Sequence, residues 1–403
     1  MTAIRFKSFA REVSIRSADG SEELLTVSHI TGVTPRSEKN VNMFEAESLE
    51  GYKIVEPGDL VVNTMWAWMG ALGVARTRGI VSPAYGVYRL DPSKVDPRYV
   101  EAHLKQPQII AEITARSTGV WSSRLRLYAD ELLDMRIELP PLVHQRAVAD
   151  YLDHETTRLD AVLARRRDQR TILDLRRRAI VDGLTVPAAL GGQADRDGGW
   201  RVSKRKHASA FFTDGDWIES PHITTDGIRL IQTGNIGEGE FRDHGFRYIS
   251  EDTFDALGCT EVRPGDILIS RLAGTVGRAC LAPDLGTRMV VSVDVVIMRP
   301  TKELDPRFVV AYLSSSYHLE LAELLARGTT MARLSRSQVG EMPLPTPPLR
   351  EQLRIADAVA EHSLLLGRAV AALDRQIDLL LERRQALITA AMTGQLEIPG
   401  VAA

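Results

Sequence analysis

The stretch "PPLVHQRAVADYL", from Pro140 to Leu152, returns as "PPLREQLRIADAV", from Pro347 to Val359. Both copies hold Pro-Pro-Leu, a glutamine three residues after the leucine, and an Ala-Asp pair. They stand 207 residues apart, which is about half of the 403-residue chain. A segment that recurs at this distance indicates an internal duplication.

More pairs of segments follow the same register. They are "EPGDLVVN" (56–63) with "RPGDILIS" (263–270), "DPRYVEAHL" (96–104) with "DPRFVVAYL" (305–313), and "RL" (126–127) with "RL" (333–334). The first pair is a Pro-Gly turn before an apolar, β-branched strand. The offset is 207, then 209, then 207 again. A return to one offset after small changes is typical of duplicated domains, because insertions and deletions fall in surface loops.

A long helical pattern follows each Pro-Pro pair. Its seam positions in the first half are 152, 156, 159, 163, 166, 170, 173, 177, 180 and 184, and the same positions recur 207 residues later. A period of 3.5 residues kept over this length predicts coiled-coil pairing. Proline suits the first helical turn, while Gly183 and Gly394 mark the ends. Each helix should have about 40 residues and a length of about 60 Å.

The first seam is the more polar one. Arg166, Arg170 and Arg177 occupy core-like positions, so we expect their stems to lie along the seam and their charged ends in water.

These segments give a plan for the whole chain. We predict domains at 1–139 and 201–346, long helices at 140–186 and 347–398, and a flexible linker at 187–200. The two globular parts contain short β-rich runs, turn signals and a helix near each Asp-Pro-Arg, which favours an α+β fold.

Composition limits the functional classes. The two cysteines exclude a disulfide framework and have no zinc-type spacing. The net charge of −3 is not the basic signature of a nucleic-acid-binding domain, so DNA binding would need local clusters of Arg and Lys. No signal peptide is recognised at the N-terminus, and the apolar run 60–75 is shorter than the ~20 residues that a bilayer requires. We expect a cytoplasmic protein without a membrane segment.

Catalytic patterns are absent from the sequence. The nine histidines form no recognisable triad, and no P-loop occurs. Each Pro-Pro pair follows Leu139 or Thr346, whereas the amino-methyltransferase motif has an acidic or amide residue there. No glycine-rich S-adenosylmethionine motif is visible either. The sequence therefore predicts neither a catalytic centre nor a metal site.

The ordered, duplicated set of motifs resembles the specificity subunit of type I restriction–modification systems. The resemblance covers nearly the whole chain and includes the helix ends "RRRAIVDGLT" and "RRQALITAAMTGQL". It implies two tandem mixed α/β target-recognition domains separated by two long helices that form an antiparallel coiled coil, with pseudo-two-fold symmetry. It also implies a non-catalytic subunit that binds double-stranded DNA and recruits two methyltransferase subunits and, for restriction, motor-nuclease subunits. S-adenosylmethionine, ATP and Mg²⁺ would belong to those partners alone.

The two domains differ strongly around their shared framework. "NTMWAWMGALG" in the first stands where the second has "SRLAGTVG". Two readers on one face of B-DNA need centres about 34–36 Å apart, and a stiff coiled coil is a suitable spacer. We therefore expect a bipartite, asymmetric target.

Residues for DNA contact are chosen by chemistry, since phosphates are bound by Arg, Lys and small polar groups and bases by Arg, Asn or Gln. The candidates are Lys39, Asn40, Trp66, Trp68, Arg76, Arg78, Trp121, Arg124 and Arg126 in the first domain, and Asn235, Arg271, Arg278, Thr330, Arg333 and Arg336 in the second. Arg126 and Arg333 match between the halves, so we expect them to share a role on the DNA backbone. For each arginine the alternative is a merely solvated side chain. Of the two alternating tryptophans in the first loop, one could be a core residue and the other exposed, or both could be core residues.

The repeated residues at the helix starts have a different predicted role. Helix and partner docking is assigned to Pro140, Pro141, Gln145, Pro347, Pro348 and Gln352. Two other functions remain open. A coiled-coil scaffold for proteins would bind its partners without regard to salt or DNA, and a stand-alone methyltransferase would bind S-adenosylmethionine by itself.

Overall fold

The computed structural model describes residues 3–38, 48–119, 125–186, 199–326 and 332–399. The chain divides into two compact units, 1–165 with 376–403 and 166–375. Each unit contains one globular part and a portion of each long helix. Among the described residues, no helix is both long and apolar enough to cross a bilayer.

The first globular part is built from short strands and three short helices. Its elements are β1 (Ala3–Arg5), β2 (Ala10–Glu12), β3 (Leu25–Ser28), β4 (Gly32–Pro35), β5 (Lys53–Val55), β6 (Leu60–Val62), β7 (Leu72–Val74), β8 (Gly79–Val81), β9 (Gly86–Leu90), α1 (Pro97–Leu104), α2 (Pro107–Arg116), α3 (Ala129–Asp134) and β10 (Arg136–Glu138). The long helix α4 (Leu142–Thr185) follows.

Among the described residues, the second globular part repeats this order with one change: two strands and a helix stand where the first part has β3, β4 and β5. Its elements are β11 (Arg201–Lys204), β12 (Ser209–Asp214), β13 (Ile228–Ile231), β14 (Arg247–Ile249), α5 (Glu251–Leu257), β15 (Ile267–Ser270), β16 (Ala279–Leu281), β17 (Met289–Val291), β18 (Val295–Pro300), α6 (Pro306–Leu313), α7 (Ser316–Ala326), α8 (Arg336–Glu341) and β19 (Pro343–Thr346). The long helix α9 (Leu349–Met392) completes it.

The central sheets have the same topology in both parts. The strand order β2-β9-β6-β7 in the first corresponds to β12-β18-β15-β16 in the second, and every pairing within them is antiparallel. A small antiparallel pair lies beside each sheet, β1 with β10 and β11 with β19. The sheets differ in their companions, since β5 pairs with β8 whereas β13 lies between β14 and β17.

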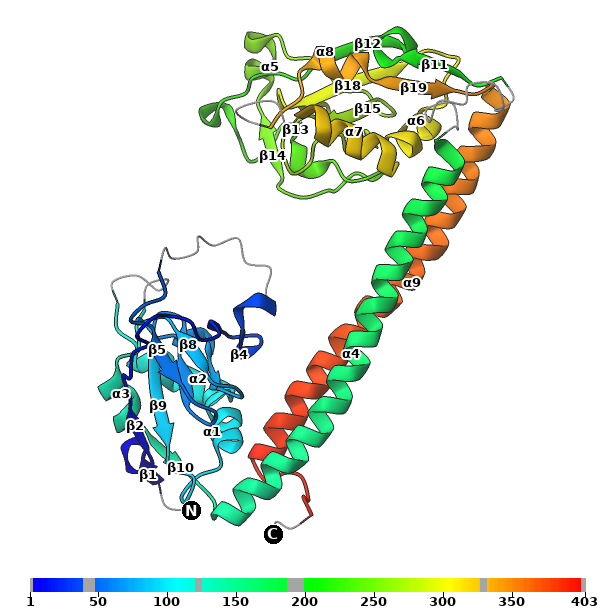
Figure 1. The fold of residues 1–403 in the computed structure, drawn as a ribbon. Coiled ribbons are helices and arrows are strands. Elements are labelled where there is room, and N and C mark those ends of the chain that lie inside the picture. Colours follow the sequence, from blue (N-terminus) through cyan, green and yellow to red (C-terminus); the bar gives the residue numbers. More distant parts are fainter. Residues whose placement is uncertain (1–2, 39–47, 120–124, 187–198, 327–331, 400–403) are drawn as a thin grey trace. The chain divides into compact units, whose positions relative to one another are not determined.

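The two 44-residue helices α4 and α9 pack antiparallel (Figure 1). In the first unit Arg384 donates to Asp160 at 2.9 Å, and in the second Arg170 donates to Asp374 at 2.6 Å. At 1.5 Å per residue each helix is about 66 Å long. The predicted fold class, two mixed α/β domains with an antiparallel pair of long helices, is confirmed.

The seam follows the heptad positions read from the sequence. Of the twenty seam positions, only Arg170 is classed as exposed, and it forms the ion pair with Asp374. Leu152, Leu163 and Ala391 are the best buried of them. Apolar residues just outside the seam, such as Leu175 and Leu379, remain largely exposed. The stripe that holds the helices together is therefore narrow, as in coiled coils.

Candidate nucleic-acid interface

A buried glutamine attaches each long helix to its own globular part. Gln145 Oε1 accepts the Asp96 N–H at 3.0 Å, and its Nε2 donates to the carbonyls of Lys94 and Pro140. Gln352 does the same with the Asp305 N–H at 2.8 Å and two carbonyls. A side-chain amide that satisfies three buried backbone groups is costly to replace. The repeated glutamine therefore has a structural reason at both helix starts.

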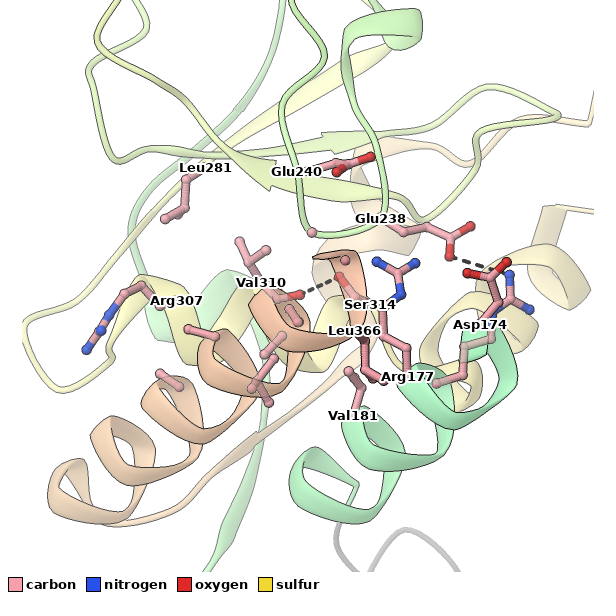
Figure 2. Close-up of a pocket in the computed structure, with 18 of the residues that line it drawn as sticks. Asp174, Arg177, Val181, Glu238, Glu240, Leu281, Arg307, Val310, Ser314 and Leu366 are labelled. Carbon is pink, nitrogen blue, oxygen red and sulfur yellow. Dashed lines mark hydrogen bonds and ion pairs between the residues drawn. The ribbon is translucent and has the colours of Figure 1, made fainter. Parts of the chain in front are cut away.

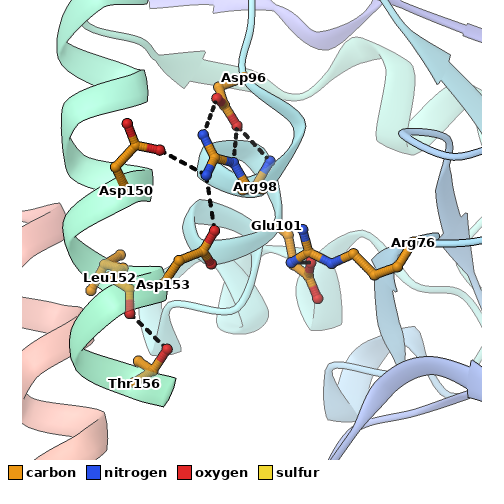
Figure 3. A network of polar contacts seen from close by, with 8 residues as sticks. All are labelled: Arg76, Asp96, Arg98, Glu101, Asp150, Leu152, Asp153 and Thr156. Atoms are coloured by element: carbon orange, nitrogen blue, oxygen red, sulfur yellow. Dashed lines mark hydrogen bonds and ion pairs between the residues drawn. The ribbon is translucent and has the colours of Figure 1, made fainter. Parts of the chain in front are cut away.

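An arginine clamp lies beside each glutamine. Asp96 caps α1 by accepting the Arg98 N–H at 2.9 Å, and the Arg98 guanidinium reaches Asp150 and Asp153 of α4 (Figure 3). Burial alone would raise the pKa of Asp96, but the hydrogen bonds and charge of Arg98 outweigh it and lower that pKa.

The second unit repeats the clamp. Arg307 bonds the capping carboxylate of Asp305 and reaches Asp357 of α9 at 2.8 Å. The sequence carried the signal for these acids, because Asp150 and Asp357 are the second members of the repeated Ala-Asp pair. Sequence reasoning gave them no role.

The Pro-Gly-Asp turns are also held from within. Asp59 accepts two bonds from Arg89, both at 2.9 Å, and Asp266 accepts two from Arg299, both at 2.7 Å. Charge-assisted pairs of this bidentate kind are the stronger class of hydrogen bond. The shared sequence motifs thus map to the framework that supports the variable loops.

One edge of each globular part joins the segment before the last short helix to the loop after a central strand. The Leu127 N–H donates to the Thr64 carbonyl at 2.9 Å, and the Leu334 N–H donates to the Arg271 carbonyl at 3.0 Å. We call these the first and second loop edges. They bring Arg126 near the Trp66 loop and Arg333 near Arg271.

The first loop edge gathers positive charge. Arg126 is exposed, lies over the Tyr128 ring at 5.6 Å, and forms no ion pair within the described ranges. Burial is the main cause that lowers the pKa of Lys53, Glu12 opposes it, and the charges of Arg16 and Arg126 lower that pKa further. Lys53 and Arg16 are also backbone partners in an isolated bridge. Sequence reasoning missed Arg16 and Lys53, which belong to no repeated motif.

The second loop edge contains both signs of charge. Arg271 is only 4% exposed and donates to the carbonyls of Val293 and Leu334. Burial is the main cause that lowers its pKa, with the carboxylates of Asp214 and Asp294 opposing. Arg333 forms an ion pair with Asp294 at 2.8 Å, while Arg336 is exposed at the start of α8. Arg271 therefore has an internal role, and Arg333 and Arg336 face the surface.

The tryptophans of the first loop lie outside the core. Their indole rings stack with centroids 6.0 Å apart, Trp66 is exposed, and Trp68 is half-buried. The core alternative for both tryptophans therefore does not hold in the structure.

Other candidates lie apart from these edges or inside the fold. Arg76 pairs with Glu101 (Figure 3), Arg78 with Glu56, and Arg278 with Glu238. Asn235 is buried, and its amide caps a short turn by bonding Gln232, Arg242 and His244 backbone groups. Lys39, Asn40, Trp121, Arg124 and Thr330 lie outside the described residues.

A cavity of about 550 Å³ lies in the second unit (Figure 2). Its walls come from α4, α6, α9 and residues 238–241. Most side chains of the helices that face it are apolar, including Val310 and Leu366, whereas Arg177 and Glu238 are charged. The helices are thus not completely packed at this point.

Groups for metal binding do not assemble in the described part of the chain. No group of three or more His, Cys, Asp or Glu side chains that could hold a metal ion occurs there. Burial raises the pKa of Cys259 to about 11 and that of Cys280 to about 12, so both thiols stay protonated and unreactive at neutral pH.

Comparison with known proteins identifies the class of domain. Residues 216–365 match the family model of the type I restriction modification DNA specificity domain. The specificity subunit of the type I restriction enzyme EcoBI from Escherichia coli is 24% identical over 384 residues, which cover 86% of this chain and 75% of that protein.

A solved structure has the same fold. A chain from a study of complex assembly and conformational transition of the type I R-M system gives a TM-score of 0.73 at 17% identity, with 98% of both chains covered. The HsdS subunit from Thermoanaerobacter tengcongensis gives 0.47 at 18% identity, with 98% of this chain and 97% of that chain covered.

These findings agree with the duplicated architecture. The chain is similar over most of its length to a specificity subunit of a type I restriction enzyme, and residues 216–365 match the DNA specificity domain of such subunits. Within such a system the specificity subunit recognises the target sequence. Members of the family are non-catalytic and carry no cofactor.

Proposed function

We propose that this subunit reads a bipartite, asymmetric sequence in double-stranded DNA, with one half read at each loop edge. The observation that carries the proposal is the contrast between a shared framework and unlike edges. Leu127 and Leu334 make the same backbone bond, yet the groups beside them are an exposed tryptophan in one unit and a buried arginine in the other. Readers with unlike side chains select unlike sequences.

We propose Arg126, Arg333 and Arg336 as contacts to the DNA backbone, and we add the exposed Arg16 to the first edge. Lys53 is buried and bonded to the Tyr85 carbonyl, so it supports this edge from within. Arginine and lysine at phosphates fix the register of a protein on DNA. The overall charge of −3 does not oppose this role, since Arg16 and Arg126 lie together at the first edge and Arg333 and Arg336 at the second. Asn235 and Arg271 are better suited to support the fold than to touch DNA, because both are buried and bonded internally.

We propose that two methyltransferase subunits dock on the paired helices and the Pro-Pro segments Pro140–Pro141 and Pro347–Pro348, and that motor-nuclease subunits join for restriction. Large apolar side chains outside the helix seam support this assignment: Ile172, Leu175, Leu364, Leu365 and Leu379. Concentrations of exposed apolar side chains, such as those on α4 and α9, are typical of protein interfaces. The scaffold alternative shares this feature but gives no reason for the cations at the loop edges.

The domain boundaries proposed from the sequence are kept, with target-recognition domains at 1–139 and 201–346. The ends of β10 at Glu138 and of β19 at Thr346 support them. We place the protein in the cytoplasm, since the DNA that such a complex would methylate lies there.

The experiment is single-molecule mapping of methylated adenine in cells that carry or lack the gene. We expect one split motif with two unlike halves to lose its methylation when the gene is deleted, and to regain it when the gene is returned. A control strain lacks the methyltransferase partner and should lose the same motif. If no split motif depends on the gene, the proposal is wrong.

A further inference from the structure

A short turn in the first unit presents large apolar side chains to solvent. Met65 and Trp66 are each 47% exposed and Met69 is 38% exposed, within the five residues Met65–Met69 that follow β6. We call these five residues the tryptophan turn. Single exposed apolar residues are common, but three in one turn are a concentrated patch.

The exposure does not come from a loosely held loop. Ala67 at the centre is fully buried, the Ala71 N–H donates to the Trp66 carbonyl at 3.1 Å, and the Trp68 indole N–H donates to the Met65 carbonyl at 3.0 Å. Thr114 of α2 donates to the Trp68 carbonyl at 3.3 Å. Gly70 ends the turn with φ of +84°, in the left-handed region that favours glycine. The turn is therefore preorganised with Trp66 pointing away from the core.

The surroundings of the tryptophan turn are positive. Thr64, which precedes it, donates to the Ala84 carbonyl, and Lys53 donates to the carbonyl of the next residue, Tyr85, at 2.7 Å. Thr64 also receives the N–H of Leu127, which stands between Arg126 and the exposed Tyr128. The buried residues Thr64 and Leu127 thus link the tryptophan turn to the exposed Arg126 and Tyr128 of the first loop edge.

We propose that the tryptophan turn is an apolar wedge, with Trp66 stacked against bases at an opened step of the half-site read by the first domain. The inference rests on the proposed function and adds a mode of reading to it. Proteins that insert apolar side chains between base steps unstack and bend the duplex, and they do so beside cations that hold the phosphates. Aromatic rings stack on any base, so the wedge favours base-pair steps that unstack easily and does not select one particular base.

An exposed tryptophan in the second unit has a different charge environment and gives a comparison for Trp66. Trp217 in the second unit is more exposed than Trp66, at 68%, but its indole donates to the Glu219 carboxylate at 3.4 Å, and a phosphate would be repelled there. The second loop edge has no equivalent turn, because its loop from Arg271 to Gly274 is three residues shorter than the loop from Thr64 to Gly70. Distortion is therefore confined to one half of the target.

The test uses the full chain assembled with its methyltransferase subunits on a duplex containing the mapped target. 2-Aminopurine is placed at successive steps of each half-site, away from the methylated adenines. We expect bound wild-type complex to raise its fluorescence at one or two steps of the first half-site alone. Trp66→Ala should abolish that rise and weaken binding about 5- to 150-fold, whereas Trp66→Phe should largely retain both.

Trp217→Ala is the matched control and should change neither readout. The wedge is overturned if Trp66→Ala leaves the fluorescence rise in place, or if no step of the first half-site brightens. It is also overturned if Trp66→Ala weakens assembly with the methyltransferase in the absence of DNA, because the turn would then be a protein contact. In each of these cases the split methylation motif can persist, so failure of the wedge is distinct from failure of the proposed function.

Discussion

The two units make the same backbone hydrogen bond with residues whose side chains differ. The Phe6 N–H donates to the Met135 carbonyl in the first, and the Arg205 N–H donates to the Met342 carbonyl in the second. Both side chains are completely buried. Met135 and Met342 stand 207 residues apart, so this is the duplicated framework again. One side chain is an aromatic hydrocarbon and the other a guanidinium.

The second unit accommodates the guanidinium with a buried polar chain. Arg205 donates to His318 Nδ1 at 2.7 Å, so His318 Nε2 carries the proton and donates to the Gly277 carbonyl at 2.9 Å. Burial lowers the pKa of Arg205 to about 10, and burial with the charge of Arg205 lowers the pKa of His318, which keeps it neutral. Gly277 belongs to the variable loop. The difference teaches that backbone bonds preserve the framework, while even a core position can be altered to support a different loop.

The largest effect on stability is expected from variants that remove the buried glutamine which both units share. Gln352→Leu and Gln145→Leu each leave three buried backbone groups unpaired, at about 1–3 kcal/mol per group. We expect each variant to lose at least about 3 kcal/mol of the free energy of unfolding, measured by urea denaturation. The exposed Gln376→Leu is the control and should be nearly unchanged. A loss of similar size from both buried sites would support their equivalence, and a negligible loss from either would refute it.

An intermediate effect is expected on DNA binding, and its size should differ between arginine variants of the first and second loop edges. Arg126→Ala should weaken DNA binding by the assembled complex and reduce the slope of log affinity against log salt by about one, because an exposed cation is lost. Arg333→Ala should have a smaller effect, since Asp294 already neutralises part of its charge. Asp294→Asn should strengthen binding. Salt titrations of the three complexes on one duplex measure this, and equal slopes for both arginine variants would contradict it.

The smallest effect concerns a second duplicated ion pair. Lys204 and Lys206 bond Glu341 and lower its pKa to about 2, and Lys7 lowers the pKa of the equivalent Asp134. Both folded-state pKa values lie below the unfolded ones. Their stabilisation is therefore present above about pH 4.5 and disappears as pH falls towards 2.

Both acids are exposed, so the contribution should be small and reduced by salt. Melting temperatures of the wild type and Glu341→Gln are compared at pH 6 and pH 3, and the difference between them should be smaller at pH 3. Glu382→Gln, an exposed acid on α9, is the control. A difference between wild type and Glu341→Gln that grows on acidification would have the wrong sign.

The internal repeat allowed the two domains and the paired long helices to be predicted from the sequence. The heptad positions predicted the seam because one period governs both helices, and the Asp-Pro-Arg and Pro-Gly-Asp segments marked the same structural turns twice. The chain plan from residues 1 to 398 remains a prediction at its boundaries, and most of the linker lies outside the described residues.

The candidate site was less accessible to sequence reasoning. Arg126 and Arg333 could be paired because they share a register, but nothing local reveals that Asp294 lies against one of them. Arg16 and Lys53 reach the first loop edge through β pairing with each other, which joins segments far apart in sequence. Asn235 has the chemistry of a base reader, and only its three internal bonds reveal that it caps a turn.

The leucines on the outer faces of the long helices affect how the protein can be made. Leu364, Leu365 and Leu379 are each more than half exposed. Such side chains in water favour self-association, and a chain synthesised alone would be drawn towards aggregates. We therefore expect soluble yield to depend on simultaneous synthesis of a partner that covers these leucines, so that supply of the partner sets how much of this subunit accumulates.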